Sequence, residues 1–479
     1  MSQRLNKTVF IKTYGCQMNE RDSEIICGMM MQEGYAPVQS ADEADLIIYN
    51  TCSVRKHAED RVWGNLGSLV KVIGPPSFAS AKLSRGATKP KRILGLVGCM
   101  GKAYGKEVFR RLPHVDFVCG PANIYDIPEI IDKIRAGKKH IVSIGREKRP
   151  MKKGSAAYRD EKIRAFVNIG EGCDNFCSYC IVPHVRGREA SRPAKDIIDE
   201  IKRLVDAGTK EVTLLGQNVN SYGEKPATKG SPERRRGETS NQLPDFVGLL
   251  EEINKIDGLE RIRFMTSHPK DVSVYLFSAM RDLKKVCEHL HIPLQSGADR
   301  ILKLMNRKYT VSHYLGLVDS LRKIIPDVTI TTDIIVGFPG ESDKDFMDTY
   351  MLMKEIKFDS SFIFKYSPRP FTKAADLDDD VPRKIKEERN QSLLILQNDM
   401  TRYKNEQRIG SVEEALGLRP AKRKPSASND LSGFFIKGRT RGNQQVVYKG
   451  DKSLIGALSD VKIKDIEEKT LIGELKGAI

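Results

Sequence analysis

No apolar run in this chain approaches the roughly 18 residues of a membrane-spanning helix, and its first residues contain no apolar core of a secretory signal peptide. Acidic residues are comparatively few: 63 Asp and Glu stand against 80 Lys and Arg, so the formal net charge is +17. This excess favours a polyanionic partner, most simply a nucleic acid, with a basic enzyme lacking such a partner as the alternative. These features predict a cytoplasmic protein without a membrane segment.

Cysteine is scarce, with nine residues, an odd number, in a chain of 479. This usage fits reduced thiols and metal ligation better than a disulfide framework. Three of the nine, Cys173, Cys177 and Cys180, stand in one loop with the spacing C-x3-C-x2-C. Three thiolates can hold three irons of a cubane iron–sulfur cluster and leave the fourth iron open for a substrate or cofactor. The alternatives are a zinc site with His184 as the fourth ligand, or three thiols that stand together by chance.

The first part of the chain, from about residue 6 to 145, alternates short apolar runs with helical patterns. This alternation predicts an open parallel α/β sheet with helices on both faces. Cys16, Cys52 and Cys99 each follow an expected strand, and ligands of such sheets bind outside the carboxyl ends of the strands. One such cysteine alone indicates core packing, but three at equivalent positions predict a second metal site. The expected strands are 9–14, 46–50, 93–98 and 115–120, and the expected helices are 21–33, 56–72 and 124–136.

The other three cysteines are expected to be structural. Cys27 falls in the middle of an expected helix, and Cys287 lies outside any motif. Cys119 is near a strand end, but its apolar neighbours Phe117 and Val118 indicate core packing.

From about residue 159 to 398 the alternation resumes with six strand–helix units. This pattern predicts a partial (β/α)6 barrel, open on one side, with its active site at the carboxyl ends of the strands. The cysteine loop follows the first of these strands, and further polar groups follow later ones. His268 among them is expected to be a hydrogen-bonded structural residue. The expected strands are 165–169, 211–215, 261–265, 290–294, 329–336 and 360–366, and two clear helices are 196–205 and 245–256.

The last part, from about residue 400 to 476, ends in alternating apolar and polar residues with glycine turns, which predict a small β-barrel from 433 onward. Arg439, Arg441 and Lys449 occur among Phe and Tyr residues, a combination that RNA-binding β surfaces use for phosphates and bases. A barrel core with ordinary surface charge is the alternative. Basic segments at 73–92 and 224–242 are expected to be surface insertions, and 146–162 a linker.

Several motifs together resemble the methylthiotransferase family of radical S-adenosylmethionine (SAM) enzymes over almost the whole chain. They include K-T-Y-G-C-Q-M-N at 12–19, N-T-C-S-V-R at 50–55, G-C-M at 98–100 and G-C-D-N-F-C-S-Y-C at 172–180. T-S-H-P, L-Q-S-G and D-I-I-V-G-F-P-G-E follow in the order found in that family. G-R-T-R-G-N near the end resembles its RNA-binding TRAM domain, although 411–432 departs from the usual start of that barrel.

The resemblance implies two 4Fe-4S clusters. One would bind SAM and deliver an electron that cleaves it to a 5′-deoxyadenosyl radical, and the other would be an auxiliary cluster that presents sulfur. The implied residues are Cys173, Cys177 and Cys180 for the first cluster, Cys16, Cys52 and Cys99 for the second, and Gln217, Ser267 and Gln295 for SAM.

The implied reaction replaces the hydrogen on carbon 2 of an N6-isopentenyladenosine, beside the anticodon of tRNA, with a methylthio group. The implied partners are that tRNA, a reducing electron-donor protein and a sulfur donor. Two alternatives remain: a sister methylthiotransferase acting on threonylcarbamoyladenosine in tRNA or on a ribosomal-protein aspartate, and a non-catalytic RNA-binding iron–sulfur or zinc protein.

Overall fold

The computed structural model describes residues 7–53, 56–69, 92–145, 158–159, 161–223, 244–422, 425 and 433–477. Contacts divide the chain into two units that do not follow chain order. The N-terminal unit contains 1–160, 170–192 and 367–375, and the barrel unit contains 161–169, 193–366 and 376–479. The expected domain boundaries therefore stay predictions. The insertions expected at 73–92 and 224–242 lie outside the described residues, except Arg92.

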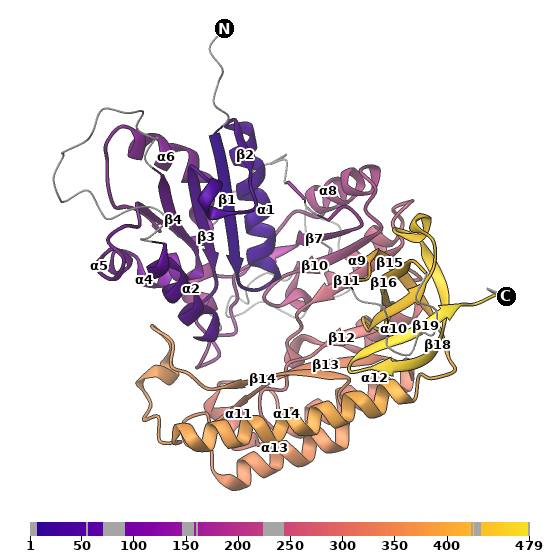
Figure 1. The fold of residues 1–479 in the computed structure, drawn as a ribbon. Coiled ribbons are helices and arrows are strands. Elements are labelled where there is room, and N and C mark those ends of the chain that lie inside the picture. Colours follow the sequence, from indigo (N-terminus) through magenta and orange to yellow (C-terminus); the bar gives the residue numbers. More distant parts are fainter. Residues whose placement is uncertain are drawn as a thin grey trace. The chain divides into compact units, whose positions relative to one another are not determined.

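The N-terminal unit contains a six-stranded parallel sheet in the order β2-β1-β3-β4-β5-β6, of which Figure 1 labels β1 to β4. Alternate residues of its strands enter two cores. Leu46 and Ile48 pack with α1 and α6 on one face, whereas Ile47 and Tyr49 pack with α2, α4 and α5 on the other. Helices on both faces confirm the expected α/β sheet. The strands are β1 (Lys7–Tyr14), β2 (Tyr35–Pro37), β3 (Leu46–Thr51), β4 (Ile93–Gly98), β5 (Phe117–Cys119) and β6 (Ile141–Ser143).

The helices of this unit differ in detail from the expected ones. The first begins at Gln17, directly after Cys16, and two short helices follow β4 that the pattern did not indicate. The helices are α1 (Gln17–Gln32), α2 (Lys56–Ser68), α4 (Cys99–Tyr104), α5 (Glu107–Arg111), α6 (Ile127–Arg135) and α7 (Val182–Arg186), and the strands β8 (Gly170–Glu171) and β9 (Ala190–Ser191) form a small hairpin.

The barrel unit contains the expected six parallel strands, in two sheets of order β11-β10-β7 and β12-β13-β14. A parallel bridge between Ile262 and Val286 joins the two sheets, which makes a partial barrel. The strands are β7 (Arg164–Asn168), β10 (Glu211–Leu215), β11 (Arg261–Met265), β12 (His289–His291), β13 (Thr329–Val336) and β14 (Ser360–Lys365), and the helices are α8 (Ala194–Asp206), α9 (Phe246–Asn254), α10 (Val274–Asp282), α11 (Asp299–Leu304), α12 (Val311–Ile324), α13 (Asp343–Ile356) and α14 (Arg383–Glu406).

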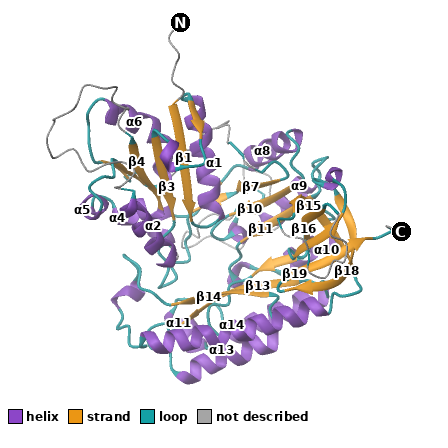
Figure 2. Ribbon diagram, in the orientation of Figure 1, coloured by secondary structure: helices purple, strands orange, loops and turns teal. Residues whose placement is uncertain are grey.

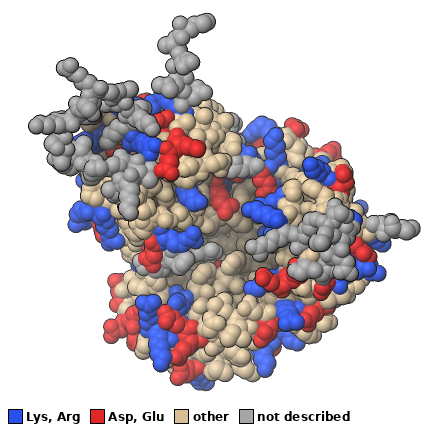
Figure 3. All heavy atoms as spheres, viewed as in Figure 1, with Lys and Arg blue, Asp and Glu red and all other residues tan. Residues whose placement is uncertain are grey.

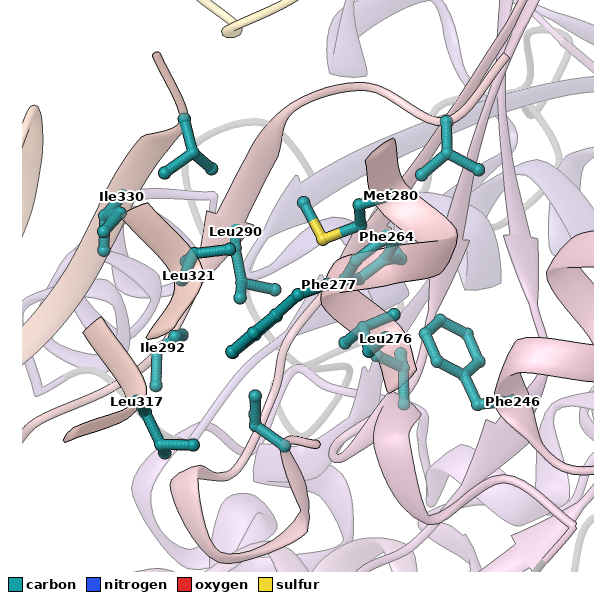
Figure 4. Close-up of a cluster of buried hydrophobic side chains, with 14 of the residues drawn as sticks. Phe246, Phe264, Leu276, Phe277, Met280, Leu290, Ile292, Leu317, Leu321 and Ile330 are labelled. Carbon is teal, nitrogen blue, oxygen red and sulfur yellow. The ribbon is translucent and has the colours of Figure 1, made fainter. Parts of the chain in front are cut away.

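Figure 2 distinguishes these strands from their helices by colour. A continuous hydrophobic core lies between them, and Figure 4 shows part of it. Phe277 of α10 is fully buried in it, among side chains from β11, β12 and α12 in the close-up. The rings of Phe246 and Phe264 meet edge to face with centroids 5.1 Å apart, joining α9 to β11. Apolar residues at helical spacing on α9 and α10 therefore hold the strands whose carboxyl ends carry the candidate SAM residues.

The C-terminal residues form a closed five-stranded barrel in the order β15-β16-β17-β19-β18. Its first strand lies at Val412–Pro420, upstream of the expected start at 433. The hairpin between β16 and β17 meets the amino-terminal ends of the partial-barrel strands: Arg263 donates to the carbonyls of Thr440 and Arg441 at 2.6 and 2.7 Å. The barrel strands are β15 (Val412–Pro420), β16 (Phe435–Thr440), β17 (Gln445–Lys449), β18 (Leu458–Glu467) and β19 (Thr470–Leu475).

Among the described residues, no helix has the length and apolar character that crossing a membrane requires. A cytoplasmic location stays a prediction. All nine cysteines are described, and none forms a disulfide bond.

Candidate iron–sulfur and cofactor sites

Cys16, Cys52 and Cys99 lie at one edge of the N-terminal sheet because their strands end in register. Tyr14 pairs with Thr51, and Thr51 pairs with Gly98, so the three strands end at the same level. Gly98 has φ +92°, and a Cβ there would lie 2.5 Å from the carbonyl oxygen of Thr51. Glycine is therefore required for the turn that leads from β4 into Cys99.

Cys52 interacts with both Cys16 and Cys99, although the three are 36 and 47 residues apart in sequence. Hydrogen bonding with the sulfurs of Cys16 and Cys99 raises the pKa of Cys52. The same bonds lower the pKa of Cys99 and lower that of Cys16 to about 5, and the Arg186 guanidinium lowers both further. The pKa values of Cys16 and Cys99 are thus shifted in the direction that favours the thiolate, the form that binds iron.

Buried amides fix the loop that carries Cys16. Its backbone N–H donates to Asn19 Oδ1 at 3.3 Å, and Asn19 Nδ2 donates to Asn50 Oδ1 at 3.1 Å. Asn50 in turn donates to the Asn19 carbonyl at 2.8 Å and to Ser23 Oγ at 3.0 Å. These bonds tie the start of α1 to the end of β3, so the positions of Cys16 and Cys52 are coupled.

The loop containing Cys173, Cys177 and Cys180 belongs to the same unit and is closed by the β8–β9 hairpin. Cys173 N–H donates to the Gly187 carbonyl at 3.2 Å, and Cys180 N–H to the Cys177 carbonyl at 3.0 Å. Cys177 is buried and the other two are partly exposed. Partial burial raises the pKa of Cys173 to about 11, and binding to a metal would favour its thiolate form.

The two cysteine sets are connected through α7, which begins two residues after Cys180. Ile181 and Val185 pack against Cys99. The last residue of α7, Arg186, pairs with Asp22 of α1 at 2.9 Å, with both side chains almost fully buried. Sequence reasoning did not find this pair, because nothing in the spacing of residues 22 and 186 indicates a contact.

The donor set fits iron–sulfur clusters. Among the described residues, no group of three or more His, Cys, Asp or Glu side chains is arranged for a single metal ion. A cluster makes a different demand, since each thiolate binds a different iron. Two sets of three cysteines, one on a sheet edge and one in a loop, supply thiolates in the number that leaves one iron of each cubane open. Which cysteines bind which cluster stays a prediction.

The residues expected to hold SAM lie at the carboxyl ends of barrel-unit strands. Ser267 follows β11, and Gln295 follows β12 with its backbone bridged to Ile334 of β13. Ser267 Oγ, Gln295 Oε1 and the neighbouring Thr266 Oγ1 are buried without a hydrogen-bond partner among the described residues. A buried polar atom without a hydrogen-bond partner lowers the stability of the folded state, so these three oxygens fit a site for a polar ligand. Gln217, after β10, is partly exposed.

His268 lies beside Ser267 and is buried, as expected of a structural residue. Burial lowers its pKa to about 2, so the imidazole is neutral at physiological pH. Its Nδ1 accepts a hydrogen bond from the backbone N–H of Lys270 at 3.3 Å. This bond caps a short turn, which agrees with a structural role.

The three expected RNA-binding residues have different environments. Arg441 donates to both carboxylate oxygens of Glu288 at 2.7 Å and to the Val286 carbonyl at 2.7 Å, which joins the C-terminal barrel to the partial barrel. Arg439 is partly buried, which lowers its pKa to about 10. Lys449 is exposed. RNA binding by these residues stays a prediction. The hydrogen bonds of Arg441 show that its side chain joins the C-terminal barrel to the partial barrel.

Arg441→Ala is expected to lower the free energy of unfolding by about 1–3 kcal/mol, because it leaves the half-exposed Glu288 without its bidentate partner. Lys449→Ala is the matched control and should change stability by less than about 0.5 kcal/mol. Denaturant midpoints of the two variants measure this difference. A wild-type midpoint for Arg441→Ala, together with weaker tRNA binding, would instead identify Arg441 as a phosphate contact.

Comparison with known proteins agrees with this architecture. Residues 167–353 match the radical SAM superfamily, and residues 8–120 match the uncharacterized protein family UPF0004. A radical S-adenosylmethionine methyltransferase from Kitasatospora setae has a similar fold, with a TM-score of 0.53 at 11% identity over 78% of this chain and 77% of that one. The protein is thus of the radical SAM class.

Relatives with higher sequence identity show which family within this class the chain belongs to. A tRNA-2-methylthio-N(6)-dimethylallyladenosine synthase of Caldicellulosiruptor saccharolyticus is 45% identical over 98% of this chain and 93% of its own length. One from Clostridium novyi is 46% identical over 98% of this chain and 97% of its own. The chain belongs to the family of tRNA-2-methylthio-N(6)-dimethylallyladenosine synthases.

Proposed function

We propose that this protein transfers a methylthio group to carbon 2 of N6-isopentenyladenosine beside the anticodon of tRNA. The observation that carries the proposal is the pair of three-cysteine sets in one structural unit, within a chain 45% identical to a synthase of that name. An unactivated aromatic C–H has no acidic proton for a side chain to remove, so cofactors must supply the chemistry. Two 4Fe-4S clusters and SAM, when bound, supply the radical, the methyl group and the site for sulfur.

The chain's own residues bind and orient these groups. Cys173, Cys177 and Cys180 would hold the cluster that binds SAM, and Cys16, Cys52 and Cys99 the auxiliary cluster. The buried hydroxyl of Ser267 and the Gln295 carbonyl oxygen would accept or donate hydrogen bonds to the polar groups of SAM. A reducing electron donor and a sulfur donor complete the requirements of the reaction.

Mass spectrometry of tRNA nucleosides from a deletion strain tests the substrate. Loss of the 2-methylthio derivative of isopentenyladenosine, with accumulation of isopentenyladenosine itself, is expected. Loss of the threonylcarbamoyl derivative instead would identify the sister enzyme. Unchanged tRNA, combined with zinc as the only bound metal, would support the non-catalytic binding protein.

The surface charge bears on how tRNA is bound. On the face shown in Figure 3, the acidic and basic side chains of the described residues are interspersed. The segments outside the described residues contain 19 basic and 6 acidic residues, a difference of 13 that accounts for most of the net charge of +17. We infer that these segments provide much of the attraction for the phosphate backbone.

Binding of tRNA is therefore expected to weaken at least about tenfold when salt rises fourfold, the loss that two or more phosphate contacts produce through counterion release. Filter binding or fluorescence anisotropy across a salt series measures this slope. A variant with Arg234, Arg235 and Arg236 changed to Gln should have a shallower slope. An affinity independent of salt would contradict the electrostatic interpretation of the charge.

A further inference from the structure

Arg186 is a buried charge with an unsatisfied donor. Its side chain and that of Asp22 are 2% and 1% exposed, and Nη2 donates to Asp22 Oδ2 at 2.9 Å. Burial of an ion pair is costly unless the remaining donors also find acceptors. Arg186 Nη1 is buried and has no hydrogen-bond partner among the described residues. The guanidinium therefore has an N–H available for a group that binds nearby.

The helix that ends at Arg186 packs against one of the auxiliary cysteines. Val185 of α7 and Ile181, which directly precedes this helix, pack against Cys99. The Arg186 charge acts on Cys16 and Cys99 as well as on Asp22. Asp22 therefore holds one side of the guanidinium in place. The positive charge of Arg186 interacts with Cys16 and Cys99 at the edge of the sheet.

We propose, in an inference that rests on the proposed function, that Arg186 is a positioning residue of the auxiliary centre. Its Nη1 N–H donates to a sulfur atom of the group held by Cys16, Cys52 and Cys99. Its positive charge favours an additional anionic sulfur ligand of the hydrosulfide class at that centre. The physical reason is that three thiolates and sulfide concentrate negative charge at the sheet edge, and a fixed, buried cation with an N–H donor offsets it.

The test uses the full chain with Cys173, Cys177 and Cys180 replaced by Ala, so that only the auxiliary centre remains. In this background Arg186→Gln is compared with the double variant Arg186→Gln/Asp22→Asn. The double variant removes both members of the pair and leaves no unpaired buried charge, so its fold is expected to persist. Arg188→Gln, an exposed arginine paired with Asp174 at 2.6 Å, is the matched control.

Three quantities are measured after anaerobic reconstitution: bound iron, the midpoint potential from an electron paramagnetic resonance titration, and the affinity for added sodium sulfide. Iron should stay at about four per chain in the double variant. The affinity for hydrosulfide should fall at least about tenfold, the loss expected for one charge-assisted hydrogen bond. Reduction should become at least about tenfold less favourable, about 59 mV for one electron.

Asp22→Asn alone gives the opposite sign, because the guanidinium charge is then no longer offset, and the midpoint potential should rise. If Arg186 and Asp22 served only in folding, the midpoint potential would not shift in opposite directions in Asp22→Asn and in the double variant. The inference would be overturned if the double variant had an equilibrium constant for reduction and a hydrosulfide affinity within about twofold of those of the background. About four irons per chain in that variant would show that its auxiliary centre is intact. A background without iron would overturn the auxiliary centre of the proposed function, and this inference with it.

Discussion

Simultaneous replacement of Cys173, Cys177 and Cys180 by Ala is expected to abolish reductive cleavage of SAM. In the proposed assignment each of these thiolates would bind a different iron, so their removal would leave no cluster to deliver the electron. Formation of 5′-deoxyadenosine under anaerobic reduction, measured by liquid chromatography, should fall to the level of a sample without protein. Methylthiolation of tRNA should disappear with it, because the same radical is needed to activate carbon 2.

The control is a variant in which Cys27 and Cys287, both buried and outside the two sets, are changed to Ala. It should retain both SAM cleavage and about eight irons per chain, the content of two cubanes. The loop variant should retain about four, which distinguishes loss of one cluster from loss of the fold. Continued 5′-deoxyadenosine formation by the loop variant would place the radical site elsewhere.

The parallel strands could be predicted because apolar and β-branched residues recur along them. Glu211–Leu215 and Thr329–Val336 were expected with the bounds that the structure has. β12 is shorter than expected and ends at His291, since Pro293 cannot donate to a strand ladder. The three-residue strands β2 and β6 are too short to produce a recognisable period.

β15 escaped prediction for a different reason. Its polar residues make contacts within the barrel unit: Glu414 accepts a hydrogen bond from Arg261 at 2.8 Å. Because such residues stand where apolar ones would be expected, the sequence lacks the apolar alternation that identifies a strand. The same effect conceals the role of Arg441, whose motif resembles an RNA-binding sequence but whose side chain binds Glu288. Charged residues that pair only in the tertiary structure give no local signal.

The convergence of the three sheet-edge cysteines could be predicted, whereas the ligand role of both cysteine sets stays a prediction. Strand ends of a parallel sheet meet at one edge, so three cysteines after three strands had to converge, and the contacts of Cys52 with Cys16 and Cys99 confirm their convergence. Arg186 and Asp22 could not be found in this way. They meet across 164 residues, and only the packing of α7 on the sheet edge brings them together.

Replacement of Cys16, Cys52 and Cys99 by Ala is expected to separate radical formation from sulfur transfer. These residues end three strands of the sheet, whereas the loop retains its own three cysteines. The variant should bind about four irons in place of about eight and still produce 5′-deoxyadenosine under anaerobic reduction. It should transfer no methylthio group to tRNA, because the site that holds sulfur is lost.

Iron analysis, 5′-deoxyadenosine quantitation and nucleoside mass spectrometry on the same preparation measure the three outcomes together. The Cys27/Cys287 variant again serves as the control and should retain all three properties. Loss of SAM cleavage in the sheet-edge variant would mean that the packing of Ile181 and Val185 on Cys99 is needed to hold the loop in its working conformation. Full methylthiolation by that variant would reduce the three sheet-edge cysteines to core packing and require a different source of sulfur.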